Sequence, residues 1–173
     1  LDGLLADLAL EAEAALAISL RIAYALDNSD DPRQAALVRS ATGIGKYWIC
    51  KRAIQHTYEA MECLGGGGYV EESVACRLYR EAPVNAIWEG SGNVQCLDLL
   101  RVLNREPDTL KALLAELEEA RGRHPLFDAR LEALLVDLAD QQDNEMRARQ
   151  SMQPQPLLRH PAPLPGYGAA PIP

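Results

Sequence analysis

Residues 27–32 have the sequence DNSDDP, and this short acidic stretch separates two long segments with helical periodicity. Pro32 suits the first turn of a helix, because its fixed backbone angle matches that turn and its missing N–H is not needed there. Asp30 and Asp31 just before it favour a helix N-terminus, where exposed backbone N–H groups attract negative charge. The stretch is therefore predicted to end one helix and start the next.

Apolar residues recur every three or four positions on both sides of this turn. The spacing predicts helices over residues 4–26 and 33–64, because a helix repeats every 3.6 residues. Two long helices joined by a short turn form an antiparallel hairpin, which is half of a helical bundle. The residues predicted on the buried sides are Leu4, Leu8, Ala12, Ala15, Ser19, Ile22 and Leu26, followed by Leu37, Ala41, Ile44, Trp48 and Tyr58.

Two glycines, Gly43 and Gly45, lie inside the second predicted helix. Each costs roughly 1 kcal/mol relative to alanine at an exposed helical position. We expect them either to let another helix approach closely or to allow a kink.

Glycine and proline divide the chain after this hairpin. Gly65–Gly68 is predicted to end the second helix, and a short helix is expected over residues 74–81. Pro83 is expected to break that helix, so that residues 84–88 are extended.

A second turn is predicted over residues 90–93, which contain Gly90 and Gly92. Ser91 and Asn93 have side chains that accept hydrogen bonds from the first N–H groups of a helix. We therefore expect them to cap a helix over residues 94–103.

The chain as a whole is predicted to be all-α. Two further amphipathic helices are expected over residues 107–121 and 126–149, followed by a proline-rich, extended or disordered tail. We expect an antiparallel bundle over residues 1–105, one or two appended helices over 106–150 and the tail over 151–173.

The composition argues against two broad classes of protein. The formal net charge of −8 argues against a strong generic nucleic-acid surface, which needs clustered lysine and arginine. The most apolar region, residues 4–20, contains Asp7, Glu11 and Glu13 and is too charged to span a membrane.

Four cysteines stand without a CxxC pair or a nearby histidine. This spacing does not suit a metal site and favours reduced thiols in a cytoplasmic protein. The sequence has no signal peptide and begins at Leu1 rather than at methionine, so we expect it to be part of a longer protein. The cysteines are Cys50, Cys63, Cys76 and Cys96.

The glycine run over residues 65–68 is the first candidate binding feature. Glycines expose backbone N–H groups and let phosphate oxygens approach the main chain. Glycine is also the commonest way for a helix to end, so the run by itself leaves both interpretations open. It is not a dinucleotide fingerprint, because no strand precedes it.

Glu89 is the second candidate, since it lies between the apolar pair Ile87–Trp88 and a turn. A carboxylate held away from water is a stronger base, which suits proton abstraction near neutral pH. The alternative is a carboxylate that only interacts with the positive end of the following helix.

These segments together resemble the C-terminal signature of acyl-CoA dehydrogenases. The chain has LGGGGY at 64–69, YRE at 79–81 and IWEGS at 87–91, in the order and spacing of that family. The stretches YWICKR at 47–52 and YREAPVN at 79–85 resemble its AidB-like branch, which is named for a protein of the adaptive response to DNA alkylation.

The resemblance implies a role for each matching residue. Glu89 would be the base that removes the α-proton of an acyl-CoA thioester, while FAD would accept a hydride. Gly65 and Gly66 would approach the FAD pyrophosphate, from the neighbouring subunit. Gly90 would let substrate and flavin pass near the backbone. Ser91 and Asn93 would hydrogen-bond the cofactor.

One implied cofactor contact differs from the family pattern. Glu62 stands where many acyl-CoA dehydrogenases have a glutamine close to FAD, and a carboxylate cannot donate the same hydrogen bond. The family's N-terminal helical domain and middle β-domain are absent, so we expect the chain alone to be inactive and to bind FAD poorly.

Two other functions follow from the same sequence. An AidB-like flavoprotein would bind DNA and act in the alkylation response with little dehydrogenase activity. A helical oligomerisation module would have no chemistry of its own. The wide apolar surface of the first two helices favours a homodimer or homotetramer.

Overall fold

The computed structural model describes residues 1–151, without the side chains of 142 and 145–151. These residues form helices joined by turns, and the described part contains no strand, which confirms the all-α prediction. The chain divides into two compact units, residues 1–121 and residues from 122 onward. The predicted tail lies outside the described residues, apart from Ser151.

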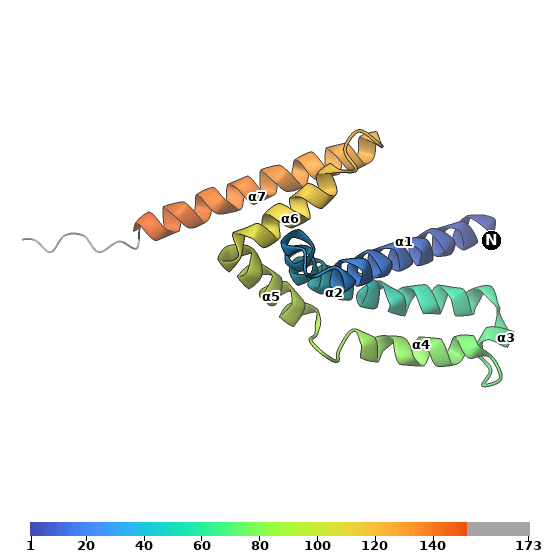
Figure 1. Cartoon of the computed structure of the whole chain (residues 1–173). Coiled ribbons are helices and arrows are strands. Elements are labelled where there is room, and N and C mark those ends of the chain that lie inside the picture. The colour runs from blue at the N-terminus through green and yellow to red at the C-terminus, as the bar shows by residue number, and fades with distance from the viewer. Residues whose placement is uncertain (152–173) are drawn as a thin grey trace, which may run out of the picture. The chain divides into compact units, whose positions relative to one another are not determined.

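The predicted hairpin is present, with α1 over Asp2–Asp27 and α2 over Pro32–Cys63 (Figure 1). Asp31 is the N-cap of α2, and its carboxylate accepts a hydrogen bond of 2.9 Å from the backbone N–H of Arg33. Pro32 occupies the first helical position, where its lack of a donor leaves no gap in the hydrogen bonding.

The face of α1 that packs on α2 matches the predicted row only in part: Leu8, Ala15 and Ile22 of that row are partly buried. Ala25 is fully buried, while Leu26, placed in that row from the sequence, is 59% exposed. An ideal Cβ atom on Gly45 would lie 2.7 Å from Ile22 Cδ1 and 3.3 Å from Ile18 Cγ2. Gly45 therefore provides close approach of the two helices, and this contact selects the buried face.

The second helix also exposes two side chains that were predicted on its buried side. Ile44 and Tyr58 are exposed, whereas Leu37 is buried as expected. Leu37 packs with Ala25 of α1 and Ala112 in one core cluster.

Four shorter helices of the first unit pack against α2. A second core cluster, formed by Met61, Ala75 and Cys76, fixes the end of α2 against the helix that begins at Val74. Because α6 packs on α2, the first unit extends past residue 105, where the bundle was predicted to end. The four helices are α3 (Gly66–Tyr69), α4 (Val74–Asn85), α5 (Gly92–Arg105) and α6 (Pro107–Glu118).

The extended stretch predicted over residues 84–88 is wrong. Helix α4 continues through Pro83 to Asn85, and turns follow over residues 86–90. Proline near a helix end removes one backbone hydrogen bond. Here the end of α4 is stabilised by Lys46 of α2, whose ammonium donates a 2.7 Å hydrogen bond to the carbonyl oxygen of Asn85.

The predicted side-chain caps of α5 are also wrong. The helix begins at Gly92, so Asn93 lies inside it, and Ser91 is its N-cap residue without a side-chain cap hydrogen bond. Helix α6 ends at Glu118, three residues earlier than predicted. In the second unit, α7 spans Pro125–Ser151.

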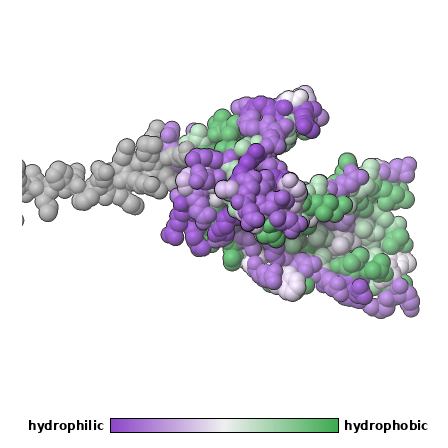
Figure 2. Space-filling view, in the orientation of Figure 1, coloured by the Kyte–Doolittle hydropathy of each residue, from purple (hydrophilic) through white to green (hydrophobic). Residues whose placement is uncertain are grey.

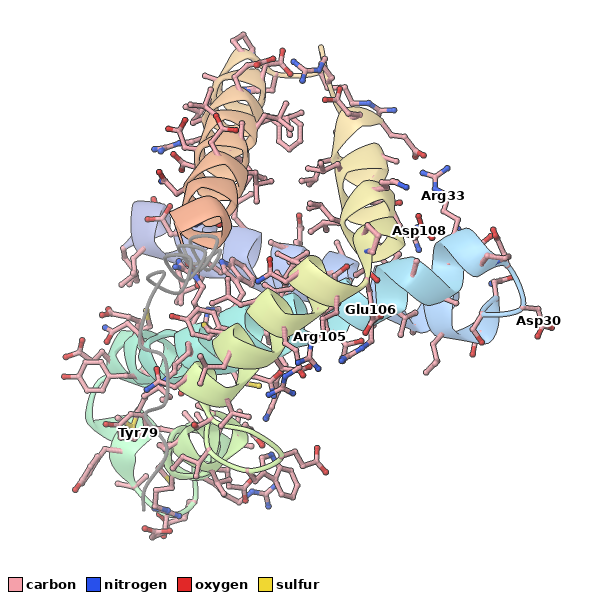
Figure 3. All side chains as sticks on the ribbon, turned by 90° about the vertical axis from the view of Figure 1, so that its left-hand side faces the viewer. Asp30, Arg33, Tyr79, Arg105, Glu106 and Asp108 are labelled. Carbon is pink, nitrogen blue, oxygen red and sulfur yellow. The ribbon has the colours of Figure 1, made fainter. Side chains whose placement is uncertain are left out.

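Charged side chains join α6 to the hairpin. Arg21 of α1 binds Glu116 with two hydrogen bonds of 2.5 and 2.7 Å, and also donates to Gln34 at 3.0 Å. Figure 3 shows Arg33 reaching from the start of α2 toward α6, where it pairs with Glu119. This network closes the end of the bundle at which α1 and α2 meet.

No described helix is long and apolar enough to cross a membrane.

The ion pair between Arg21 and Glu116 predicts a pH-dependent stability. Its hydrogen bonds and positive charge lower the pKa of the Glu116 carboxyl below 4.5. The stabilisation is therefore complete above that ordinary value and lost as the pH falls through the lowered one. We expect Glu116→Gln to reduce the free energy of unfolding by about 1 kcal/mol at neutral pH. Below the lowered pKa, where the Glu116 carboxyl is protonated in the folded protein too, the variant and the wild type should be equally stable.

Urea unfolding followed by circular dichroism measures this difference. Glu118→Gln is the control, since Glu118 lies on the same helix and pairs with Arg121 within that segment. A loss for Glu116→Gln no larger than that of the control, or one that persists in acid, contradicts the prediction.

Candidate functional site

Glu89 is held in an unusual backbone conformation on the turn between α4 and α5. Its φ is 53°, and it is the one non-glycine residue with positive φ in the described part of the chain. A side chain disfavours this region because its Cβ crowds the carbonyl oxygen. Non-glycine residues held there are concentrated at functional sites, which makes this turn the leading candidate.

Two residues that were not predicted from the sequence, Lys46 and Gln95, hold the turn in place. Lys46 of α2 donates to the carbonyl oxygen of Trp88 at 2.8 Å. Gln95 of α5 donates from its side-chain amide to the carbonyl oxygens of Glu89 at 3.1 Å and Gly90 at 3.4 Å. The turn is therefore attached by hydrogen bonds to both α2 and α5.

Glycine is required at one position beside Glu89 and permits close packing at a second. Gly90 has a φ of 109°, and an ideal Cβ there would lie 2.5 Å from the Gln95 amide nitrogen. Gly92 is buried, and an ideal Cβ there would lie 2.8 Å from Cε of Lys51 and 3.1 Å from the Tyr47 ring. Gly92 therefore lets the start of α5 lie directly against α2.

The carboxylate of Glu89 is exposed in this chain. Its apolar neighbours Ile87 and Trp88 are 66% and 57% exposed, so they do not shield it from water as the sequence suggested. They instead form an apolar surface beside the carboxylate. Water would be excluded only if another surface covered this turn.

The four glycines after α2 have different surroundings. Gly65 has a φ of 58°, and Gly68 is packed so tightly that a Cβ would lie 2.4 Å from the carbonyl oxygen of Met61. A Cβ on Gly66 or Gly67 would meet nothing within 4 Å, and neither has a positive φ. The fold itself therefore gives no reason for glycine at these two positions, whereas a group approaching the backbone would.

An open hollow of about 440 Å³ lies beside this loop. Within it the Tyr58 hydroxyl donates a 3.1 Å hydrogen bond to Glu62, which raises the pKa of Tyr58. The Tyr58 and Tyr79 rings lie 5.7 Å apart, and Figure 3 labels Tyr79. The lining residues are Tyr58, Met61, Glu62, Gly65, Tyr69 and Tyr79.

The predicted site residues thus form two groups at the two ends of α4. Glu62, Gly65 and Gly66 precede it, in or beside the hollow. The second group follows α4 and comprises Glu89, Gly90, Ser91 and Asn93. Gly90 is partly buried, and the other three residues are exposed.

Two basic residues of the C-terminal half that could contact DNA phosphates, Arg101 and Lys111, are paired with nearby carboxylates. Arg101 lies 3.1 Å from Asp98, and Lys111 lies 2.9 Å from Asp108. Such pairs along a helix are typical of a solvated face, which weakens the case for phosphate binding there.

Comparison with known proteins gives a consistent result. The family described as "Acyl-CoA dehydrogenase, C-terminal domain" matches residues 1–104. Over 134 residues the chain is 45% identical to "Putative acyl-CoA dehydrogenase AidB" of Escherichia coli (strain K12), covering 78% of this chain and 25% of the relative. Over 94 residues it is 37% identical to the mitochondrial short-chain specific acyl-CoA dehydrogenase of Bos taurus, covering 54% and 21%.

A solved structure shows the same arrangement. It is the crystal structure of Caenorhabditis elegans ACDH-11 in complex with C11-CoA, with a TM-score of 0.68 and 29% identity over 87% of this chain and 27% of that one. The chain spans about a quarter of the length of these relatives or less.

The strained backbone of Glu89 predicts a gain in stability when glycine replaces it. Glu89→Gly should unfold with a free energy about 1 kcal/mol higher than Glu89→Ala, because only glycine adopts a positive φ without strain. Both variants lack the carboxylate, so chemical denaturation of the pair isolates the backbone effect. An alanine variant as stable as the glycine variant would show that φ is not held at this value.

Proposed function

Because the chain belongs to the acyl-CoA dehydrogenase family, as its C-terminal domain, we propose that it supplies the base of an FAD-dependent flavoprotein that oxidises an acyl-CoA thioester. Glu89 is that base. The rest of the relatives' length would provide the other walls of the substrate and flavin site.

The observation that carries this proposal is the strained, tethered backbone of Glu89. A turn serving only to connect two helices would use glycine at a φ of 53°, as the chain does at the neighbouring Gly90. Keeping glutamate there has an energetic cost, which indicates that the carboxylate itself is needed.

The chemistry asked of Glu89 is the removal of one proton. The thioester carbonyl acidifies the α-carbon of the acyl chain, so a positioned carboxylate is a sufficient base. The α-proton passes to the Glu89 carboxylate, and its electron pair forms the new double bond. FAD, when bound, supplies the acceptor for the hydride that leaves the β-carbon.

The apolar residues beside Glu89 support a covered site in the complete protein. Ile87 and Trp88 present a surface that a neighbouring domain or subunit can bury. Burial would remove water from around the carboxylate and strengthen it as a base.

The chain fits FAD at the two groups of residues described above. The open backbone of Gly66 and Gly67 admits a pyrophosphate, with Gly65 shaping the loop. Glu62 accepts hydrogen bonds and would bind a cofactor hydroxyl or amino group rather than a phosphate. Gly90 admits the flavin and acyl chain near the backbone, while Ser91 and Asn93 offer exposed hydrogen-bonding groups.

The surface of α1 favours assembly with other domains or copies of the chain. Figure 2 shows hydrophobic residues gathered on the right-hand part of the molecule as it is viewed in Figure 1, where α1, α2 and α4 lie. Leu5, Leu16 and Leu20 of α1 are 46%, 59% and 60% exposed. Contiguous apolar surface of this kind marks an interface, which supports a homodimer or homotetramer of the complete protein.

Substitution of Glu89 tests the proposed function in a protein of the relatives' full length. Glu89→Gln should lower kcat for dye reduction by acyl-CoA thioesters at least about 100-fold, since a general base contributes that much or more. Bound FAD should remain at the wild-type level. Glu81→Gln, an exposed glutamate of α4, is the control. Equal turnover of Glu89→Gln and wild type would overturn the assignment of the base.

The glycine loop gives a separate test of cofactor binding. Gly66→Ala should weaken FAD binding about 10-fold or more, because a methyl group would occupy the space next to the backbone. The stability of the chain should not fall, since an added Cβ meets no atom of the chain.

Flavin fluorescence titration of the apoprotein measures the affinity for FAD, in a protein of the relatives' full length. Gly3→Ala, where an added Cβ also meets nothing, serves as the control. FAD binding as tight in Gly66→Ala as in wild type would remove this loop from the cofactor site.

A further inference from the structure

We propose that Lys46 and Gln95 are positioning residues for Glu89, acting by fixing the two peptide groups that meet at its Cα atom. The inference rests on the proposed function, in which Glu89 is the base. It adds two residues to the site that touch neither the substrate nor the reacting atoms.

Lys46 fixes the peptide group before Glu89. Its ammonium donates to the Trp88 carbonyl oxygen at 2.8 Å and to the Asn85 carbonyl oxygen at 2.7 Å. The Asn85 bond caps α4, whereas Trp88 lies beyond the helix end. The bond to Trp88 is not needed to cap the helix, and it attaches the turn itself to α2.

Gln95 fixes the peptide group after Glu89. Its amide nitrogen donates to the Glu89 carbonyl oxygen at 3.1 Å from the first turns of α5. The lack of a side chain at Gly90 makes this approach feasible, since a Cβ there would lie 2.5 Å from the same nitrogen.

Fixing both groups determines the direction of the carboxylate. The Trp88 and Glu89 carbonyl groups belong to the two peptide planes whose relative rotation defines φ and ψ of Glu89. Without these tethers the residue would relax to a negative φ, because that region is lower in energy for any side chain. The Cα–Cβ bond would then point elsewhere.

The charge of Lys46 is directed at these carbonyl oxygens. Within the described residues no carboxylate lies within 4 Å of its ammonium. Lys111 differs in this respect, since its ammonium pairs with Asp108 at 2.9 Å. Lys111 therefore provides a matched control.

The test uses a protein of the relatives' full length with FAD bound. Lys46→Met keeps most of the length of the side chain and removes its donors, and Gln95→Met keeps the length of the glutamine side chain and removes its amide. We expect kcat to fall about 10-fold in Lys46→Met and several-fold in Gln95→Met, with KM within about threefold of wild type. Lys46→Arg should recover most of the activity, and Lys111→Met should behave as wild type.

A readout independent of turnover follows the base directly. Exchange of the acyl-CoA α-hydrogen with solvent deuterium, measured by NMR, should slow in parallel with kcat. Amide hydrogen exchange in the Lys46→Met variant should accelerate over residues 86–90, with the remaining helices and the FAD content unchanged. Activity loss with a general rise in amide exchange would mean that the variant is merely unstable, and would count against positioning.

Combination with Glu89→Gln separates the two hypotheses. If Lys46 acts through Glu89, Lys46→Met should lower kcat less than about twofold in the Glu89→Gln background. An equal loss in both backgrounds, or a fully active Lys46→Met beside an inactive Glu89→Gln, overturns the positioning role and leaves the base assignment intact. A fully active Glu89→Gln overturns both.

Discussion

The structure depends on α2 remaining one continuous helix from Pro32 to Cys63. Helices α1, α3, α4, α5 and α6 all pack against it. Close contact at Gly45 sets the position of α1, and Gly92 allows α5 to lie directly on Tyr47 and Lys51. The same helix supplies Lys46 to the turn that carries Glu89, and it ends at the glycine loop.

The sequence was sufficient to predict the hairpin, because proline, acidic residues and glycine mark the ends of α1 and α2 so clearly. It located the buried face of α1 only in part, since leucine and alanine surround that helix and periodicity alone leaves neighbouring faces nearly equivalent. The buried face is selected by the close contact of Gly45 with Ile18 and Ile22, which are distant from it in the sequence. Pro83 was misjudged for a related reason: the support for the end of α4 comes from Lys46, 39 residues away.

The candidate site shows the same division. The resemblance to acyl-CoA dehydrogenases drew attention to Glu89 and to the glycines, and the family comparison supports that origin. Lys46 and Gln95 were missed because each stands in an ordinary helical pattern, without a motif to mark it. Only the folded arrangement shows that they bind neighbouring carbonyl oxygens on one turn. The exposure of Ile87 and Trp88 could not be read either, because it depends on which surfaces cover them.

The second half of α2 connects the two groups of candidate site residues. Lys46 and Cys63 are 17 residues apart on α2, so the axial distance between them is roughly 26 Å at the helical rise of 1.5 Å per residue. The helix therefore carries the glycine loop at its C-terminal end and holds the carboxylate turn near its middle. A small rotation of α2 would displace the loop and the turn together, so their spacing is preserved while their common orientation changes.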